Sequence, residues 1–260
     1  MEDPQVADQT VEHEVDWQRR VVGRSLRSAT ERSVDRGARL IRAAGVVLER
    51  SDGGDITVQD VADEAGQSLR TLYQYFESKD DLLLALFEES MRAYALLLDR
   101  AIAEIDDPLE RLAGAILAAL RMPEVSDTGL NRGLVRLRLR LADSSPELVG
   151  RAQTAVVTFM KDLVVAAQAA GRVGLDDPDA ATFLILSMNT AVITARMGSD
   201  AGVSGPDRLA AVEFCLGGLR ADVASVDLAE LDGRIVLPKP APRARRARAK
   251  AKSKKRTPSK

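Results

Sequence analysis

A short segment in the first third of the chain brings together hydroxyl, guanidinium, amide and ammonium side chains at helical spacing. Its members are Ser68, Arg70, Thr71, Tyr73, Gln74, Tyr75 and Lys79. Arginine can bind guanine and glutamine can bind adenine through paired hydrogen bonds, and hydroxyl and ammonium groups commonly hold phosphate oxygens. The segment is therefore suited to contact the base edges and phosphates of DNA, with an ordinary solvated helix face as the alternative.

The apolar residues around these side chains predict two short helices joined by a tight turn. They are Val58, Val61, Ala62 and Ala65, at spacings i, i+3, i+4 and i+7, and then Leu69, Leu72 and Phe76. Gly66 stands between the two sets, where the chain must reverse and where a positive φ is usually needed. Residues 57 to 76 therefore predict a helix-turn-helix, whose second helix is laid in the major groove of DNA.

Hydroxyl residues mark where three helices should begin. Thr57, Ser68 and Ser78 occupy expected N-cap positions, and Asp60 and Asp81 follow two of them at N3. A side-chain oxygen at the N-cap accepts a hydrogen bond from a backbone N–H of the first turn, and a carboxylate at N3 can accept one in return. These residues predict helix starts directly after positions 57, 68 and 78.

Residues 71 to 82 read Thr-Leu-Tyr-Gln-Tyr-Phe-Glu-Ser-Lys-Asp-Asp-Leu, and the helical pattern before them extends back to Leu40. This region resembles the signature of the TetR family of bacterial transcriptional regulators. The resemblance implies phosphate-contacting or positioning roles for one group of residues, Thr71, Tyr73, Tyr75 and Lys79. It places a second group nearest the bases, namely Ser68, Arg70 and Gln74, and Thr57 completes the predicted DNA-binding set.

Two residues depart from the family pattern and affect how the second helix is rotated. Gln67 stands where the family usually has a small apolar residue, and Leu69 stands where an exposed polar residue is common. Leu69 either packs inward, as its spacing indicates, or touches a thymine methyl group.

Charge is distributed unevenly along the 260 residues, although the formal net charge is only −2. Residues 239–260 contain 11 of the 37 basic residues and no acid, which leaves 26 basic against 39 acidic residues in 1–238. Residues 32–81 hold 7 basic and 10 acidic residues, so DNA binding there must depend on a few well-placed groups. Residues 227–260 are expected to form a disordered basic tail. Its expected partner is the phosphate backbone, with a solubilising tail or a tether to the acidic body as alternatives.

The N-terminal extension, residues 1–31, is acidic up to Asp16 and basic after it. The basic residues are Arg19, Arg20, Arg24 and Arg27. Such a run can act as a DNA arm that enters the minor groove. Apolar residues are interleaved with it at Trp17, Val21, Val22 and Leu26. Their spacing equally predicts a short amphipathic helix that covers part of the body.

The rest of the chain reads as helices separated by short polar breaks. Helices are expected near 80–104, 108–121, 128–142, 146–170, 177–198 and 206–225. Residues 134–141 alternate like a strand, but a helix is expected because no partner strand is visible. The expected fold is all-α, with an N-terminal three-helix helix-turn-helix domain over 32–81 and a larger helical effector-binding and dimerisation domain over 82–226.

The last two of these helices are the expected dimer surface. Their apolar residues are Phe183, Leu184, Leu186, Met188, Ala191, Val192 and Ala195 in the first, and Leu209, Val212, Leu216 and Leu219 in the second. A helix that is apolar on two sides needs two partners. The family resemblance implies the same surface, because its members pair through these helices as a four-helix bundle. A homodimer of this kind would place two reading helices in successive major grooves.

A pocket for a small hydrophobic effector inside the larger domain is implied by the resemblance. Its candidate lining is Phe87, Met91, Tyr94, Met122, Phe159, Met160, Phe183 and Met188, with Asn189 to hold a polar group. The alternative is that these are ordinary core residues. The low aromatic content of 3% favours a largely aliphatic or acyl ligand.

Catalysis and membrane insertion are not expected. The one histidine, His13, lies in the acidic extension, so neither catalytic residues, a metal site nor a cofactor is predicted. Cys215 stands alone and is expected in a helix core. No apolar run approaches the roughly 18 residues that indicate a membrane helix, and a cytoplasmic location is expected.

The expected function is sequence-specific transcriptional regulation by a homodimer. It is expected to be a repressor that a small hydrophobic effector releases from a palindromic operator. The alternative is a protein that coats DNA without sequence preference, driven by the basic tail.

Overall fold

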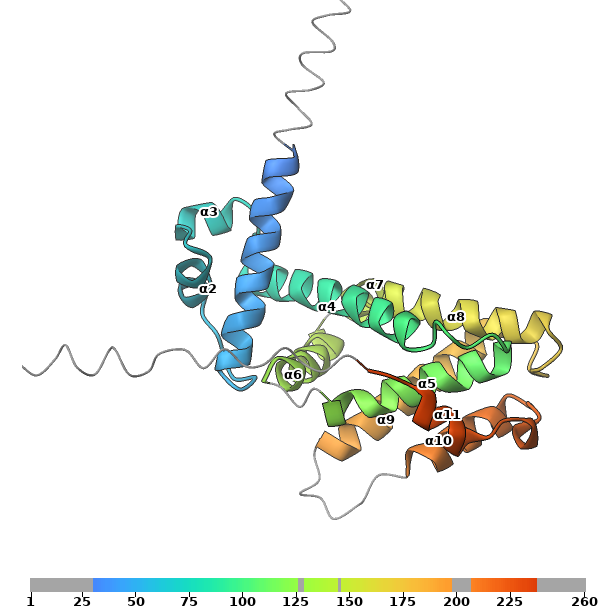
Figure 1. The fold of residues 1–260 in the computed structure, drawn as a ribbon. Coiled ribbons are helices and arrows are strands. Elements are labelled where there is room, and N and C mark those ends of the chain that lie inside the picture. The colour runs from blue at the N-terminus through green and yellow to red at the C-terminus, as the bar shows by residue number, and fades with distance from the viewer. Residues whose placement is uncertain (1–29, 126–128, 145, 198–206, 238–260) are drawn as a thin grey trace, which may run out of the picture.

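The computed structural model describes residues 30–125, 129–144, 146–197 and 207–237, and the regular structure within these ranges is helical (Figure 1). A helix over residues 30–50 comes first. It is followed by α2 (Val58–Ala65), α3 (Leu69–Tyr73), α4 (Lys79–Ala101), α5 (Pro108–Val125), α6 (Gly129–Ser144), α7 (Pro146–Ala152), α8 (Thr154–Ala169), α9 (Pro178–Met197), α10 (Arg208–Gly218), the 3-10 helix η2 (Val223–Ser225) and α11 (Leu228–Arg234). The all-α prediction is confirmed.

The first hydrophobic core lies under the helix-turn-helix. Leu40 of the 30–50 helix, Val61 of α2 and Leu72 of α3 are fully buried there. Leu69 is partly buried against the same core, so its inward packing is confirmed. Figure 1 shows α2 and α3 beside the 30–50 helix, at the opposite end of the molecule from α8 and α10.

This core continues beyond residue 82. The first turns of α4 contribute Leu82, Leu83, Leu86 and Phe87, and α6 and α7 contribute Leu134, Leu137, Leu141, Val149 and Ala152. The helix-turn-helix therefore shares buried side chains with helices of the larger domain, and the two regions pack continuously.

The three predicted helix starts are confirmed in atomic detail. The Thr57 hydroxyl accepts a hydrogen bond from the N–H of Asp60 at 3.1 Å, and the Asp60 carboxylate accepts one from the N–H of Thr57 at 3.3 Å. Ser68 and Ser78 each accept a bond from the backbone N–H three residues further on, at 3.1 Å in both cases. Gly66 ends α2 with a φ of 63°, in the left-handed region that favours glycine.

The second core surrounds α5. Leu112, Ile116 and Leu120 of this helix are fully buried, and α4, α8, α9, α10 and α11 all contact it. Cys215 of α10 is buried in this core, as expected, and burial raises the pKa of its thiol to about 11. The thiol is therefore protonated at neutral pH and unreactive.

Several expected helix boundaries are wrong. The 146–170 helix is interrupted at Gln153, which separates α7 from α8. The 206–225 helix ends at Gly218, because two consecutive glycines weaken the helix and Arg220 then adopts a φ of 55°. The second helix of the helix-turn-helix stops at Tyr73, with Gln74 as its C-cap.

The expected start of the disordered tail at residue 227 is also wrong. Asp227 caps α11, because its side chain accepts hydrogen bonds from two backbone N–H groups of the first turn, at 3.1 and 2.9 Å. Leu231, Ile235 and Leu237 are then buried in the second core. The folded chain therefore extends to residue 237, where these three apolar side chains hold it against the second core. The segment is short, so the spacing of its apolar residues was too weak a signal to predict a helix.

The expectations for the basic arm within residues 1–29, and for the tail beyond residue 237, lie outside the described residues. In the part of the chain that is described, no helix has both the length and the apolar character needed to cross a membrane. The same residues hold no group of three or more His, Cys, Asp or Glu side chains that could bind a metal ion.

Candidate DNA-binding surface and ligand pocket

The outer face of α3 presents three side chains that are available to a partner. Arg70, Tyr73 and Gln74 are exposed, and within the described residues their side chains make no hydrogen bond or ion pair. Leu72 on the opposite side is fully buried and fixes the rotation of the helix. A guanidinium, a phenol and an amide are therefore directed outward from a short helix, where they can reach base edges in a major groove.

The hydroxyls of Thr57, Ser68 and Thr71 stabilise helix starts. Thr57 Oγ1 donates to Oδ2 of Asp60 at 2.7 Å, and Ser68 Oγ lies 2.9 Å from Oγ1 of Thr71. Thr57 and Ser68 are also exposed. The first turn of a helix favours negative charge, so both positions suit a phosphate oxygen as well as a cap.

Tyr75 and Lys79 lie beyond the end of α3. Tyr75 is half-buried, and its ring lies close to Gly37 of the 30–50 helix. Lys79 Nζ pairs with Oδ1 of Asp55 at 3.3 Å. The predicted DNA-binding residues therefore fall into two groups. Three have exposed side chains without a partner among the described residues, and the other five, Thr57, Ser68, Thr71, Tyr75 and Lys79, also make contacts within the protein.

Two arginines that sequence reasoning misses lie beside the start of α3. Arg36 and Arg39 of the 30–50 helix are exposed and line an open hollow together with Gly66, Ser68 and Thr71. Their spacing of three residues puts them on one helix face, and this spacing is the signal that could have found them. Two cations beside a helix N-terminus suit a phosphate of the DNA backbone.

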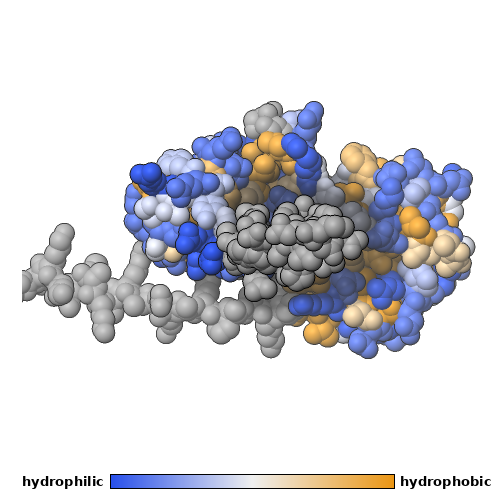
Figure 2. Space-filling view, turned by 90° about the horizontal axis from the view of Figure 1, so that it is seen from above, coloured by the Kyte–Doolittle hydropathy of each residue, from blue (hydrophilic) through white to orange (hydrophobic). Residues whose placement is uncertain are grey.

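The two ends of the molecule differ in surface character. In Figure 2 the helix-turn-helix end, on the left, is mainly hydrophilic, whereas hydrophobic patches appear over the larger domain on the right. The exposed apolar residues of α9 and α10 are Phe183, Leu184 and Phe214.

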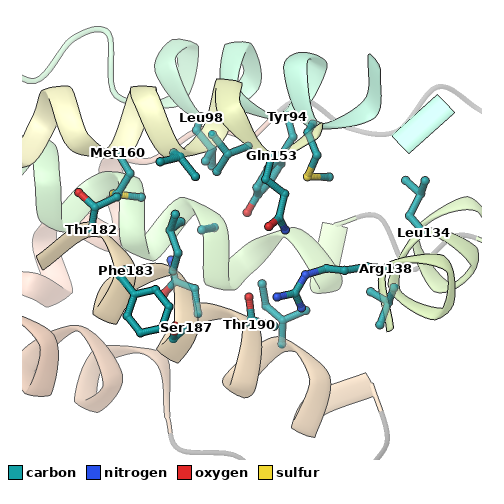
Figure 3. Close-up of a pocket in the computed structure, with 18 of the residues that line it drawn as sticks. Tyr94, Leu98, Leu134, Arg138, Gln153, Met160, Thr182, Phe183, Ser187 and Thr190 are labelled. Carbon is teal, nitrogen blue, oxygen red and sulfur yellow. The ribbon is translucent and has the colours of Figure 1, made fainter. Parts of the chain in front are cut away.

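A cavity of about 350 Å³ lies between α4, α6, α8 and α9 (Figure 3). Six of the predicted pocket residues line it: Phe87, Met91, Tyr94, Met160, Phe183 and Asn189. The other three, Met122, Phe159 and Met188, do not line it and pack against the second core. Residue type could not separate the two groups, because large apolar side chains fill cores and line cavities alike.

Polar groups that sequence reasoning misses stand toward one end of this cavity. Figure 3 shows Arg138 of α6 and Gln153, between α7 and α8, directed into the same space near Thr190 of α9. Tyr94 of α4 also lines the cavity, and burial raises the pKa of its phenol far above the ordinary value. Its hydroxyl therefore remains a hydrogen-bond donor at neutral pH.

Residues 40–86 match the family model described as "Bacterial regulatory proteins, tetR family", and they include α2, Gly66 and α3. The helix-turn-helix region of the chain is therefore of the TetR family type. A curated relative, the uncharacterised HTH-type transcriptional regulator MT1294 of Mycobacterium tuberculosis, is 33% identical over 93 residues. These are 36% of this chain and 45% of MT1294, so the chain spans less than half the length of this relative.

Solved structures share the fold over most of the chain. RolR in complex with resorcinol has a TM-score of 0.58 and 18% identity, covering 82% of this chain and 98% of RolR. FadR from Bacillus subtilis in complex with stearoyl-CoA has a TM-score of 0.54 and 21% identity, covering 70% of this chain and 96% of FadR. At these identities the likeness is one of fold.

Helix α6 lies between the cavity and the helix-turn-helix region. Arg138 is on its cavity side. On the other side, the N–H of Leu130 donates to Oε2 of Glu49 at 2.7 Å, and Nη1 of Arg136 donates to the carbonyl of Gly53 at 2.9 Å. One helix therefore contacts both the cavity and the turn that leads into the helix-turn-helix.

Gly133 allows α6 to approach the 30–50 helix closely. We expect Gly133→Val to lower the free energy of unfolding by about 1–3 kcal/mol, because a Cβ at this position would lie 2.6 Å from Cγ of Leu48. Urea denaturation measures the change. Gly150→Val is the matched control, since nothing lies within 4 Å of a Cβ at Gly150 in α7. Equal effects of the two substitutions would contradict the close contact of α6.

Proposed function

We propose that this chain is a homodimeric transcriptional repressor of the TetR family, released from a palindromic operator when a small hydrophobic effector fills the cavity. The observation that carries the proposal is the outward face of α3. Arg70, Tyr73 and Gln74 are exposed there, without intramolecular partners among the described residues. Such side chains on a helix-turn-helix read base edges, and the family match of residues 40–86 supports this role.

Exposed apolar and small residues on the last two long helices support the homodimer. Phe183 and Leu184 of α9 are 70% and 58% exposed, and Phe214 of α10 is 77% exposed. Gly217 and Gly218 follow Phe214 by about one turn and have open space where a Cβ would stand. Large exposed apolar side chains beside glycines are expected where a second copy packs closely, and a twofold axis there would pair two α3 helices.

Contacts of α6 support coupling between the effector and DNA. Because α6 lines the cavity on one side and is bonded to Glu49 and Gly53 on the other, a ligand that shifts it also shifts the helix-turn-helix. An effector weakens DNA binding if it favours a spacing of the two α3 helices that no longer fits successive major grooves. The complexes of RolR with resorcinol and of FadR with stearoyl-CoA support ligand binding within this fold.

Selection of genomic fragments by the full-length protein tests the proposed function. We expect the recovered fragments to share a palindromic sequence, whose half-sites are separated by about one helical turn. Genes next to these fragments would indicate the chemical class of the effector. Recovery of fragments without a shared sequence would contradict a sequence-specific repressor.

Arg70→Ala is expected to weaken operator binding by about 1–3 kcal/mol and to relax the preference at one base pair of each half-site. Fluorescence anisotropy with the operator and its single-base variants measures both effects. Arg50→Ala is the control, because Arg50 is paired with Glu64 at 2.8 Å. If Arg70→Ala weakened binding to all sequences alike, Arg70 would be a phosphate contact and not a base reader.

Coating of DNA without sequence preference is the second candidate function. Residues 239–260, with 11 basic residues and no acid, favour it. Binding of that kind would be similar on all sequences and would fall steeply with added salt.

A further inference from the structure

The cavity contains a cationic group without a counter-ion among the described residues. Arg138 lines the cavity, its Nε is buried, and no described residue gives its guanidinium a hydrogen bond or ion pair. Neighbouring arginines of α6 contact the helix-turn-helix region instead, Arg132 through Asp52 and Arg136 through the Gly53 carbonyl. Figure 3 shows the Arg138 side chain extended from α6 toward Thr190.

The carboxylate found in the cavity wall does not balance this charge. Asp179 lines the cavity, but its Oδ1 accepts a hydrogen bond from Nζ of Lys161 at 2.7 Å. The charge of Arg138 is therefore unmatched within the described lining. Arg138 is half-buried with its Nε fully buried, and a charge that is partly removed from water is stabilised by pairing, so this guanidinium is suited to an anionic ligand.

A second polar group in the cavity wall also lacks a partner. Asn189 of α9 is 4% exposed, and neither its amide nitrogen nor its amide oxygen has a hydrogen bond within the described structure. Thr182 on the same helix is buried too, but its hydroxyl donates to the carbonyl of Pro178 at 2.7 Å. Buried polar groups are hydrogen-bonded in the large majority of cases, so Asn189 indicates a polar atom that a bound molecule supplies.

The side of the cavity away from Arg138 offers apolar surface. Figure 3 places Leu98 and Met160 there, beside Thr182, whose hydroxyl is already bonded to the carbonyl of Pro178. A molecule that matches both ends has an anionic head and an apolar body. At about 30 Å³ per non-hydrogen atom, a cavity of about 350 Å³ holds roughly a dozen such atoms.

We propose that the ligand of this cavity is a monocarboxylate with an apolar body, whose carboxylate is bound by Arg138 and whose body lies against Leu98 and Met160. A guanidinium and a carboxylate form two parallel hydrogen bonds, and one cation matches one negative charge. Gln153 and Thr190 lie near the head and can complete its hydrogen bonds (Figure 3). That this ligand is also the effector that controls DNA binding rests on the proposed function.

Isothermal titration calorimetry with the full-length protein tests this inference. The probes are octanoate with 1-octanol, and 3-phenylpropanoate with 3-phenyl-1-propanol, so that each pair differs in its charged head. We expect at least one carboxylate to bind about 10- to 100-fold more tightly than its alcohol. Arg138→Met is expected to remove this difference, and Arg138→Lys is expected to retain part of it. Arg151→Met, at an exposed arginine of α7 outside the cavity lining, is expected to retain all of it.

Three results would overturn the proposal: alcohols that bind as tightly as the carboxylates, an undiminished difference in Arg138→Met, or no binding of either carboxylate. Circular dichroism establishes that each variant is folded. If Arg138→Met is unfolded, the comparison of Arg138→Lys with the wild-type protein tests the role of Arg138 in carboxylate binding. Operator binding is measured on the same preparations. Sequence-specific DNA binding without carboxylate binding overturns this inference alone, whereas carboxylate binding without sequence-specific DNA binding overturns the proposed repressor alone.

Discussion

Phe214→Asp is expected to convert the protein from a dimer to a monomer and to lower its affinity for the operator by about 100-fold or more. Phe214 of α10 is 77% exposed in the single chain. The proposed twofold interface would bury two copies of this side chain, and each buried phenylalanine contributes about 1.5–3 kcal/mol. The substitution replaces this gain with two carboxylates that repel each other, and each monomer then binds one half-site.

Sedimentation velocity gives the oligomeric state, and an electrophoretic mobility shift gives the operator affinity. Val236→Asp is the matched control, because Val236 is also 77% exposed and lies outside α9 and α10. A Phe214→Asp variant that remained a dimer with unchanged operator affinity would show that the interface lies elsewhere on the surface.

Deletion of residues 227–260 is expected to lower the free energy of unfolding by roughly 5–9 kcal/mol. It removes Leu231, Ile235 and Leu237, which are 2%, 2% and 8% exposed, and burial of each such side chain contributes about 1.5–3 kcal/mol. It also deprives Arg121 of the carbonyls of Asp232 and Ile235, to which its Nη1 donates at 2.7 and 3.0 Å. A loss of this size approaches the whole stability of a typical domain, so the shortened chain should be largely unfolded.

Thermal denaturation followed by circular dichroism measures this loss. Deletion of residues 239–260 is the control, because it removes the basic tail and keeps every contact described for α11. If both deletions melted at the same temperature as the full chain, the buried segment 228–237 would contribute little to stability.

The fold of the helix-turn-helix follows from strong local signals. A hydroxyl before each helix, a carboxylate three residues after two of these hydroxyls and a glycine at the turn all act within a few residues, so the roles predicted for Thr57, Ser68 and Gly66 are confirmed. The rotation of α3 also followed from spacing, since Leu69 and Leu72 pack inward. The length of α3 did not follow from this spacing. The helix ends at Tyr73, with Gln74 as its C-cap, and Phe76 is buried in the core from beyond the helix.

The candidate site was less predictable because it depends on which helices meet. Arg132, Arg136 and Arg138 are close in sequence and alike in type, yet the first two contact the turn after the 30–50 helix and the third lines the cavity. The end of the fold was missed for a similar reason. Leu231 and Ile235 form too short an apolar pattern to indicate burial. They are buried because α11 packs against α5.

Sequence-specific recognition by α3 is tested most directly by measuring DNA binding across a salt series. The measurement compares the full-length protein with the chain that lacks residues 239–260. Each protein is titrated against the selected operator and against random DNA of the same length. We expect the deletion to reduce the dependence on salt while a preference of about 1,000-fold or more for the operator survives. Equal affinities for the two DNAs, or a preference that disappears with the tail, would contradict recognition by α3.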